Sequence, residues 1–404
     1  MVGGYLLGHF WWGSVFLINV PLVALALVSG RALLPESRDP TASRLDAGGA
    51  VLSIAAMSAL LWAIIEAPQH GWTDRVTLGT FALAGVLLLA FFVWERRVDA
   101  PMLDMAFFGD PRFSAASGSI ALVFFALFGS FFLFTQLLQF VMGYSALQAG
   151  LRLLPVSIVL GVVDPLSARL VERVGSNVVV TAGLLVVAVG LGMASMFDIG
   201  SGYGGLLPGM LVLAAGMGLT MAPATESIIG SLPSAKAGVG SAVNDTTREL
   251  GGALGVAVLG SLLASGYASS LGNALRTVPL PAELAGVVRE SVGAAIEVAG
   301  GMGGPAGEGL ALAARTAFVD AMGLGLVVAT VAALFGALVT AVFLPSQSRE
   351  VTGDGTRGDD RAGLLPSLRL QPVEGARSRR HQWMSTLRRR RERHGDGAAA
   401  RTAA

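Results

Sequence analysis

The 404-residue chain has no cysteine and few charged residues, with Asp, Glu, Lys and Arg making up 14% of it. Without cysteine it can form no disulfide, thiolate metal site or cysteine nucleophile. Soluble domains carry about 25% charged residues, so this fraction argues against an ordinary soluble domain. Its four histidines share no metal-ligand spacing, and no Gly-x-x-x-x-Gly-Lys-Ser/Thr loop is present. We therefore expect no enzymatic activity, no metal, no ATP and no other cofactor.

What remains is strongly apolar. Hydrophobic residues make up 53% of the chain and the mean hydropathy is +0.67. Apolar runs of 18 or more residues recur, and each can cross about 30 Å of hydrocarbon. The pattern predicts an all-α polytopic bundle in the cell membrane, with the lipid bilayer as its surroundings. Nine spans are expected, at residues 14–33, 47–66, 76–94, 113–140, 147–167, 178–197, 204–229, 249–268 and 316–344.

The positions of Arg and Lys in the loops indicate the orientation of the spans. One set of alternate loops holds most of them: Arg31, Arg38, Arg44, Arg96, Arg97, Arg112, Arg169, Arg173, Lys236 and Arg248. The short loops of the other set hold little more than Arg75. Positive loops face the cytoplasm, so we expect the first set and the C-terminus to be cytoplasmic and the long loop 269–315 to be outside.

Two segments differ from the spans in composition. The loop 269–315 is rich in Ala and Gly and is expected to hold a short amphipathic helix near 282–298. The segment 346–404 is polar and contains a run of four arginines at 388–391. Such a run is typical of a solvated tail or of one that binds anionic lipid headgroups. Lipid is a simpler partner for it than nucleic acid.

The beginning of the chain carries a recognisable pair of motifs. Gly3-Gly4 precedes Phe16-Leu17-Ile18-Asn19-Val20-Pro21. This resembles the fourteen-span drug:proton antiporters of the major facilitator superfamily, in which Gly-Pro-x-x-Gly-Gly closes the fifth span and Phe-Leu-Ile-Asn-Val-Pro opens the sixth. The resemblance implies that Gly3 and Gly4 are the remnant of the antiporter motif. It also implies that the first four spans and most of the fifth precede Met1 in the family.

The resemblance implies a major facilitator fold, present as its second half with two extra central spans. Residues 1–13 would be the remnant of the fifth span, and 14–112 the sixth span with the two extra spans. Residues 113–345 would form a C-terminal six-span bundle that includes the outer loop 269–315, and 346–404 a disordered basic cytoplasmic tail.

A second stretch, residues 168–175, resembles the cytoplasmic loop Gly-x-Leu-x-Asp-Arg-x-Gly of the superfamily, with Ala168 and Glu172 as departures. An acid and arginines at the mouth of a span can pair in one conformation and separate in another. We expect Arg169, Glu172, Arg173 and Gly175 to form a conformational loop. The alternative is that these arginines only set the topology.

A third stretch, residues 222–260, closely resembles the actinobacterial multidrug members of the same family. Asp245 and Glu249 are four positions apart and hence on one helical face, with Arg248 beside them. Carboxylates at a membrane entrance can exchange protons as their hydration changes, which suits proton coupling or substrate contact. The alternative is that Asp245 caps the helix and Glu249 lies in its first turn. Gly251 and Gly255 form a small-xxx-small pair for close helix packing.

Charged residues inside spans are functional candidates because their burial in a membrane is costly. Asp164 falls near the inner end of the span 147–167, and Glu226 near the inner end of 204–229. A plain interfacial role is the alternative for both. Phenylalanines crowd the span 113–140 and either line a cavity for cations or pack against helices and lipid.

The implied function is export of hydrophobic or cationic drugs in exchange for protons. The expected partners are these small molecules, protons and lipid. The alternative is a non-transporting membrane fragment, or a half-transporter that needs a separately encoded N-terminal half.

Overall fold

A computed structural model describes residues 2–33, 46–99, 101–103, 105–232, 237–275 and 282–344, all within one unit, residues 1–349. Every regular element among them is helical. The α-helices are α1 Val2–His9, α2 Ser14–Leu17, α3 Asn19–Leu33, α4 Ala47–His70, α5 Arg75–Glu95, α6 Pro111–Gln136, α7 Ala146–Val174, α8 Ser176–Ser195, α9 Gly202–Gly230, α10 Ala237–Ala274, α11 Ala282–Glu290, α12 Val292–Met302 and α13 Gly304–Phe343. Short 3₁₀ turns lie at Met105–Gly109 (η1) and Ile199–Ser201 (η3), and a π turn at Leu137–Val141 (η2).

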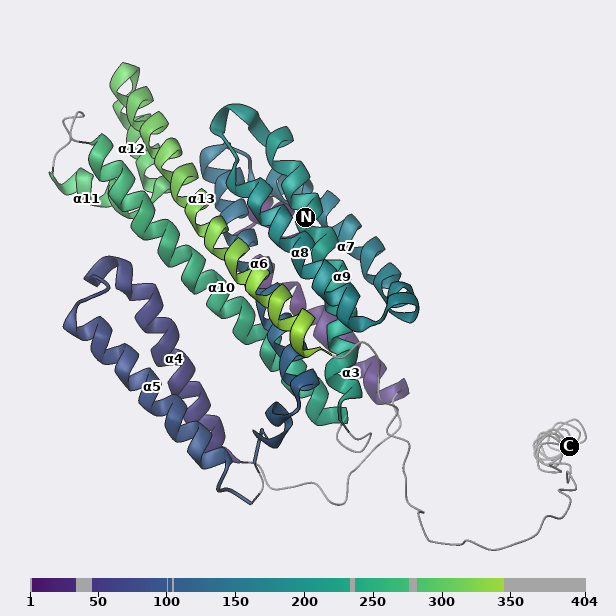
Figure 1. Ribbon diagram of the computed structural model, residues 1–404. Coiled ribbons are helices and arrows are strands. Elements are labelled where there is room, and N and C mark those ends of the chain that lie inside the picture. The colour runs from purple at the N-terminus through teal and green to yellow at the C-terminus, as the bar shows by residue number, and fades with distance from the viewer. Residues whose placement is uncertain are drawn as a thin grey trace, which may run out of the picture. The chain divides into compact units, whose positions relative to one another are not determined.

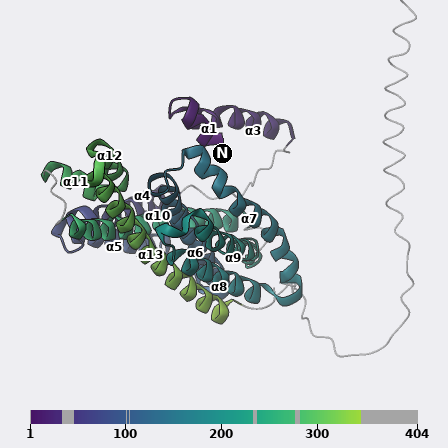
Figure 2. The same ribbon diagram turned by 90° about the horizontal axis from the view of Figure 1, so that it is seen from above.

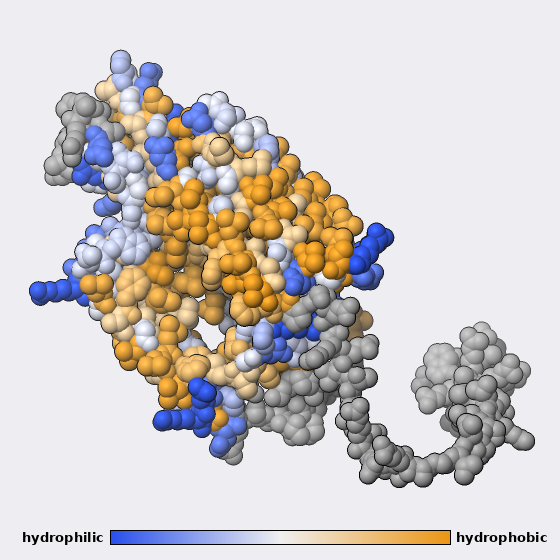
Figure 3. All heavy atoms as spheres, viewed as in Figure 1, coloured by the Kyte–Doolittle hydropathy of each residue, from blue (hydrophilic) through white to orange (hydrophobic). Residues whose placement is uncertain are grey.

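Nine stretches of the described residues are long and apolar enough to cross a membrane, as the sequence predicts. The visible face in Figure 3 is mostly hydrophobic, and hydrophilic side chains gather toward the ends of the helices. Such a band suits the hydrocarbon layer of a bilayer, because lipid accepts apolar side chains that water would not. The prediction of an all-α, multi-pass membrane protein is confirmed.

Polar side chains set where several helices begin. The Asp46 carboxylate accepts a hydrogen bond from the Gly49 amide (2.9 Å) at the start of α4. Ser145 and Gln148 exchange side-chain and backbone hydrogen bonds in a capping box at the start of α7. These contacts satisfy amides that have no partner within the first helical turn.

The centre of the bundle is α6, which packs against α8, α9, α10 and α13 (Figure 1). Large side chains fill the space between them, with Phe113 and Phe134 of α6 and Phe318 of α13 completely buried. Ser119 of α6 and Thr340 of α13 share a buried hydrogen bond of 2.7 Å. This core fixes the positions of α9 and α10, which carry most of the candidate residues.

Close packing of α10 on α6 depends on the predicted small-residue pair. A Cβ atom on Gly251 would lie 2.3 Å from the Ala121 carbonyl oxygen, and one on Gly255 2.2 Å from that of Phe125. No larger residue fits at either position without moving a helix. The predicted role of Gly251 and Gly255 in helix packing is confirmed.

The hairpin α4–α5 is attached to the bundle through α10 (Figure 1). Pro68 lies inside α4 and has no amide hydrogen, so the Ile64 carbonyl lacks its helical donor. The buried Ser261 hydroxyl of α10 donates to this carbonyl instead, at 2.9 Å. Near the hairpin turn, the Trp72 indole donates to the Ser265 hydroxyl at 3.4 Å.

Helix α1 packs against α7, and Figure 2 shows it near the beginning of that helix. A Cβ atom on Gly4 would lie 2.8 Å from the carbonyl oxygen of Ala146 and from the Cα atom of Leu147. Gly4 therefore allows the two backbones to touch, whereas Gly3 makes no close approach of this kind.

Three expectations about element ends are wrong. Helix α10 begins at Ala237, not near 249, and α13 begins at Gly304, not at 316. The expected outer loop 269–315 is therefore largely helical, because α10 runs on to Ala274 and α11 and α12 follow it. The glycine-rich turn is confined to Gly303 and Gly304, which have φ angles of +60° and +58°. Apolar periodicity did not reveal these extensions because their residues are small and mixed in polarity.

The short helix expected near 282–298 is confirmed as α11 and α12. The predicted basic tail, 346–404, lies outside the described residues. The division into a fifth-span remnant, central spans and a C-terminal bundle stays a prediction.

Candidate functional site

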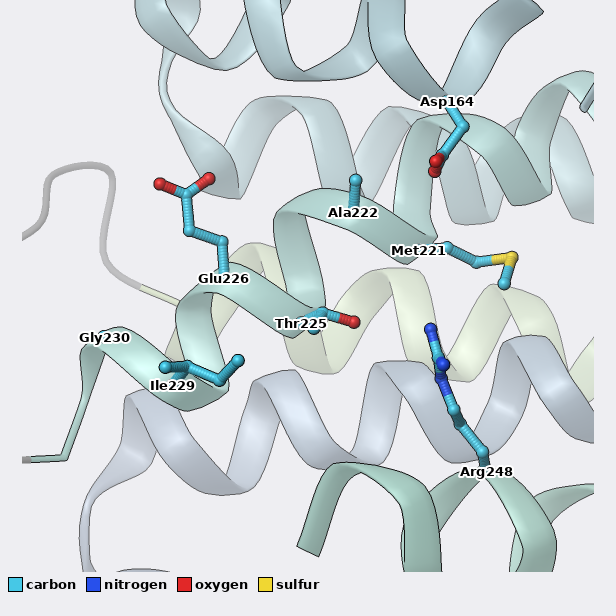
Figure 4. A pocket seen from close by; sticks show the side chains of 8 residues that line it. All are labelled: Asp164, Met221, Ala222, Thr225, Glu226, Ile229, Gly230 and Arg248. Carbon is cyan, nitrogen blue, oxygen red and sulfur yellow. The ribbon is translucent and has the colours of Figure 1, made fainter. Parts of the chain in front are cut away.

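A pocket of about 570 Å³ lies between α7, α9 and α10 and joins three of the predicted site residues (Figure 4). Its lining residues are Asp164 of α7, Met221, Ala222, Thr225, Glu226, Ile229 and Gly230 of α9, and Arg248 of α10. The lining is mostly apolar with a few polar groups, which is typical of a small-molecule site.

Asp164 enters this pocket from α7 and is half-buried. Helix α7 continues to Val174, so Asp164 lies about 15 Å from its end at 1.5 Å per residue. The helix therefore runs about two turns past the predicted end of the span at residue 167, and the position of Asp164 near the inner end of the span stays a prediction. Gly218 of α9 allows this approach, since a Cβ atom there would lie 3.1 Å from the Asp164 nitrogen.

Arg248 enters from the opposite side, and Figure 4 shows its guanidinium and the Asp164 carboxylate extending toward each other. The guanidinium carbon lies 5.0 Å from the centre of the Phe124 ring, a distance that suits a cation–π interaction. Its buried Nε atom has no hydrogen-bond partner. Neither pocket carboxylate forms an ion pair with Arg248 among the described residues, where the ion pair seen is His70–Glu66.

Glu226 lies one turn before the end of α9 and is exposed, with its carboxylate turned away from Arg248 (Figure 4). Close to it, the Thr225 hydroxyl donates to the side-chain oxygen of Asn244 at 3.2 Å. Asn244 is buried on α10, so this bond joins α9 to α10 at the floor of the pocket.

Asp245 and Glu249 do not line the pocket and are exposed on α10. Because α10 begins at Ala237, Asp245 lies in its third turn and Glu249 in its fourth. Helix capping acts only at the first turn, so the capping alternative is wrong for both residues. Their role in proton coupling stays a prediction.

The expected conformational loop is mostly helical. Arg169, Glu172 and Arg173 are exposed in the last two turns of α7. Gly175 alone separates α7 from α8 and has a φ angle of +86°, which other residues rarely adopt. Within the part of the chain that the structure describes, none of the three charged residues forms an ion pair.

Sequence reasoning missed the face of α9 that builds the pocket wall. Ala222, Thr225, Glu226 and Ile229 follow the spacing i, i+3, i+4, i+7, which places them on one side of a helix. That pattern was available in the sequence, but nothing local indicated that this side faces Asp164. No group of three His, Asp or Glu side chains suitable for a metal ion occurs among the described residues.

Comparisons with known proteins agree with this architecture. A sequence model described as "Major Facilitator Superfamily" matches residues 1–256. The chain is similar to the multidrug resistance protein Stp of Mycobacterium tuberculosis, with 36% identity over 304 residues, 74% of this chain and 56% of Stp. It is also similar to the multidrug efflux pump LfrA of Mycolicibacterium smegmatis, with 34% identity over 343 residues, 85% of this chain and 67% of LfrA.

A third relative is the tetracenomycin C resistance and export protein of Streptomyces glaucescens, with 32% identity over 344 residues, 84% of this chain and 64% of that protein. The chain thus spans about half to two thirds of the length of the curated relatives that it matches.

Proposed function

This chain belongs to the Major Facilitator Superfamily, a family of membrane transporters rather than enzymes, and we propose that it exports hydrophobic, often cationic drugs in exchange for protons. The names of its relatives support drug efflux as the activity. The observation that carries the proposal is the pocket between α7, α9 and α10, where a half-buried carboxylate stands among apolar side chains.

The Asp164 carboxylate explains how the pocket would bind a cationic drug. Met221, Ala222 and Ile229 offer apolar surface to the body of the molecule, and the carboxylate offers a charge to its cationic group. A carboxylate without an ion-pair partner is costly inside a membrane, so a counter-charge from the drug is favourable.

Exchange follows because a proton and a cation compete for one carboxylate. Protonation of Asp164 removes the charge that holds the drug, and loss of the proton restores it. We place proton entry at Asp245 and Glu249, whose exposed carboxylates lie on the same helix as Arg248. Arg169, Glu172, Arg173 and Gly175 would act at the turn between α7 and α8, where paired and separated charges favour different conformations.

The first test is Asp164→Asn, which keeps the size of the side chain and removes its charge. We expect the variant to lose roughly tenfold or more of its proton-driven efflux of a cationic dye, since the pocket then lacks its deepest carboxylate. Dye transport in everted membrane vesicles measures this, with membrane levels determined by immunoblotting. Unchanged efflux at normal membrane levels would contradict the proposed site.

The same assay tests the coupling pair. Asp245→Asn and Glu249→Gln should reduce export driven by a proton gradient while leaving dye binding intact, because neither residue lines the pocket. If both variants transport normally, these two residues have no part in coupling, and the drug site at Asp164 is unaffected by that result.

A second candidate function is that of a subunit that transports only with a separately encoded N-terminal half. Alternating access in this superfamily uses two bundles around a central site, and α7 exposes apolar side chains that a second bundle could cover, with Ile158 and Val162 each 64% exposed. Reconstitution of the purified chain in proteoliposomes distinguishes the two. Dye transport by the chain alone would exclude the subunit function.

A further inference from the structure

The charges around the pocket are not all of one sign. Asp164 and Glu226 supply two carboxylates, and Arg248 supplies a guanidinium from the opposite wall. Arg112, at the first turn of α6, lies at the rim, where a Cβ atom on Gly230 would be 3.6 Å from its guanidinium. A pocket meant only to attract cations has no need of a positive charge inside it.

The contacts of Arg248 leave part of its guanidinium without a protein partner. A structural arginine is held by carboxylates or carbonyls on several of its donors. The Nε atom of Arg248 is buried without a partner, and among the described residues its guanidinium forms no ion pair. What it faces is the Phe124 ring, the kind of surface that an aromatic cation would also use.

The energy between a fixed charge and a ligand is proportional to the charge of the ligand. Arg248 opposes each positive charge of a ligand, so it opposes a dication more strongly than a monocation, and it leaves an uncharged ligand unaffected. The size of the difference depends on how far the second charge lies from Arg248, because Coulomb energy falls with distance.

On the basis of the proposed drug site, we propose that Arg248 sets the charge selectivity of the pocket. Its fixed positive charge, opposite Asp164, offsets part of the attraction of the two carboxylates and so disfavours dications more than monocations. The substrate class that follows is apolar, mostly aromatic compounds with one positive charge or none.

Ethidium and propidium test this inference, because they share a phenanthridinium ring and differ by one positive charge. Their dissociation constants are measured by fluorescence on the purified full chain in lipid nanodiscs, with the neutral dye Nile red as a third ligand. In Arg248→Gln we expect roughly threefold tighter binding of ethidium and a larger gain, up to roughly tenfold, for propidium, because its second charge also loses the repulsion of Arg248. Nile red should be unaffected, and Arg248→Lys, which keeps the positive charge, should keep the wild-type ratio of the ethidium and propidium dissociation constants.

The outcomes separate this inference from the drug site itself. Equal changes for ethidium and propidium, or none, would overturn the role of Arg248, while binding that still depends on Asp164 would leave the drug site intact. A wild-type chain that binds neither dye would overturn both. Size-exclusion profiles report folding, and Arg248→Met, which keeps the length of the side chain, repeats the comparison if the Gln variant does not fold.

Discussion

At the scale of single residues, the environment of each acid decides what it can do. Asp164 and Asp245 are the same residue type in helices of one bundle, yet the first enters a pocket and the second faces outward. Asp46 has a third environment, because it accepts hydrogen bonds from the Gly49 amide and from the Trp94 indole, at 2.9 and 3.0 Å. Both hydrogen bonds favour the charged form of Asp46, because its carboxylate accepts them.

A pH dependence at the start of α4 follows from these contacts. The hydrogen bonds from Gly49 and Trp94 lower the pKa of Asp46 below its ordinary value of 3.8. The folded state therefore binds its proton less readily than the unfolded state. Its stabilisation is fully present above about pH 4, and it is lost as the pH falls through the lowered pKa.

We expect the protection of the Gly49 amide against hydrogen exchange to be constant from pH 7 to about pH 4 and to fall below that. Asp46→Asn is the control, because asparagine also caps helices but does not titrate in this range. Protection that falls in the variant at the same pH as in the wild type would show that another group is responsible.

At the scale of elements, the helices are held together by contacts between backbone and small side chains as much as by large apolar residues. The hairpin α4–α5 shows this most clearly, because its tie to α10 uses a carbonyl that Pro68 leaves without a donor. In a membrane such a carbonyl finds no water, so a hydroxyl from a neighbouring helix is a favourable substitute.

A double-mutant cycle tests this tie. Ser261→Ala should lower the stability of the protein by about 0.5–2 kcal/mol, because the Ile64 carbonyl then has no donor. In a Pro68→Ala background the restored amide of residue 68 can donate to that carbonyl, so the same change should cost less. Thermal unfolding in detergent measures all four proteins, and additive effects would mean that the two residues do not share this carbonyl.

At the scale of the whole molecule, its orientation in the membrane determines which side of the pocket faces the cytoplasm. The arginines of alternate loops predict that the turn between α7 and α8 is cytoplasmic and that the turn between α8 and α9 is outside. The proposed drug export requires the pocket to open alternately to these two sides.

The absence of cysteine allows a direct test of this orientation, since single cysteines can be labelled without background. We expect a membrane-impermeant maleimide to label Ser201→Cys in intact cells and Glu172→Cys only after permeabilisation. A second membrane-impermeant, thiol-reactive reagent, which carries a sulfonate group, repeats the labelling with a different charge. The reverse pattern would invert the predicted topology and exchange the two sides of the pocket.

The sequence alone determined that this is a helical membrane protein, where most spans lie and which residues could carry chemistry. These properties depend on apolar runs of about 20 residues and on charges within them, which are local. The tertiary structure decided which candidates share a site. Asp164 and Arg248 meet because α7 and α10 both pack beside α9, and no local pattern encodes that contact.

Tertiary structure also decided where α10 and α13 begin and which helix Gly4 touches. The first turns of α10 and α13 are rich in small and polar residues. For this reason neither hydropathy nor capping residues marked where these two helices begin. They are helical because neighbouring helices pack against them, and packing joins residues far apart in the chain.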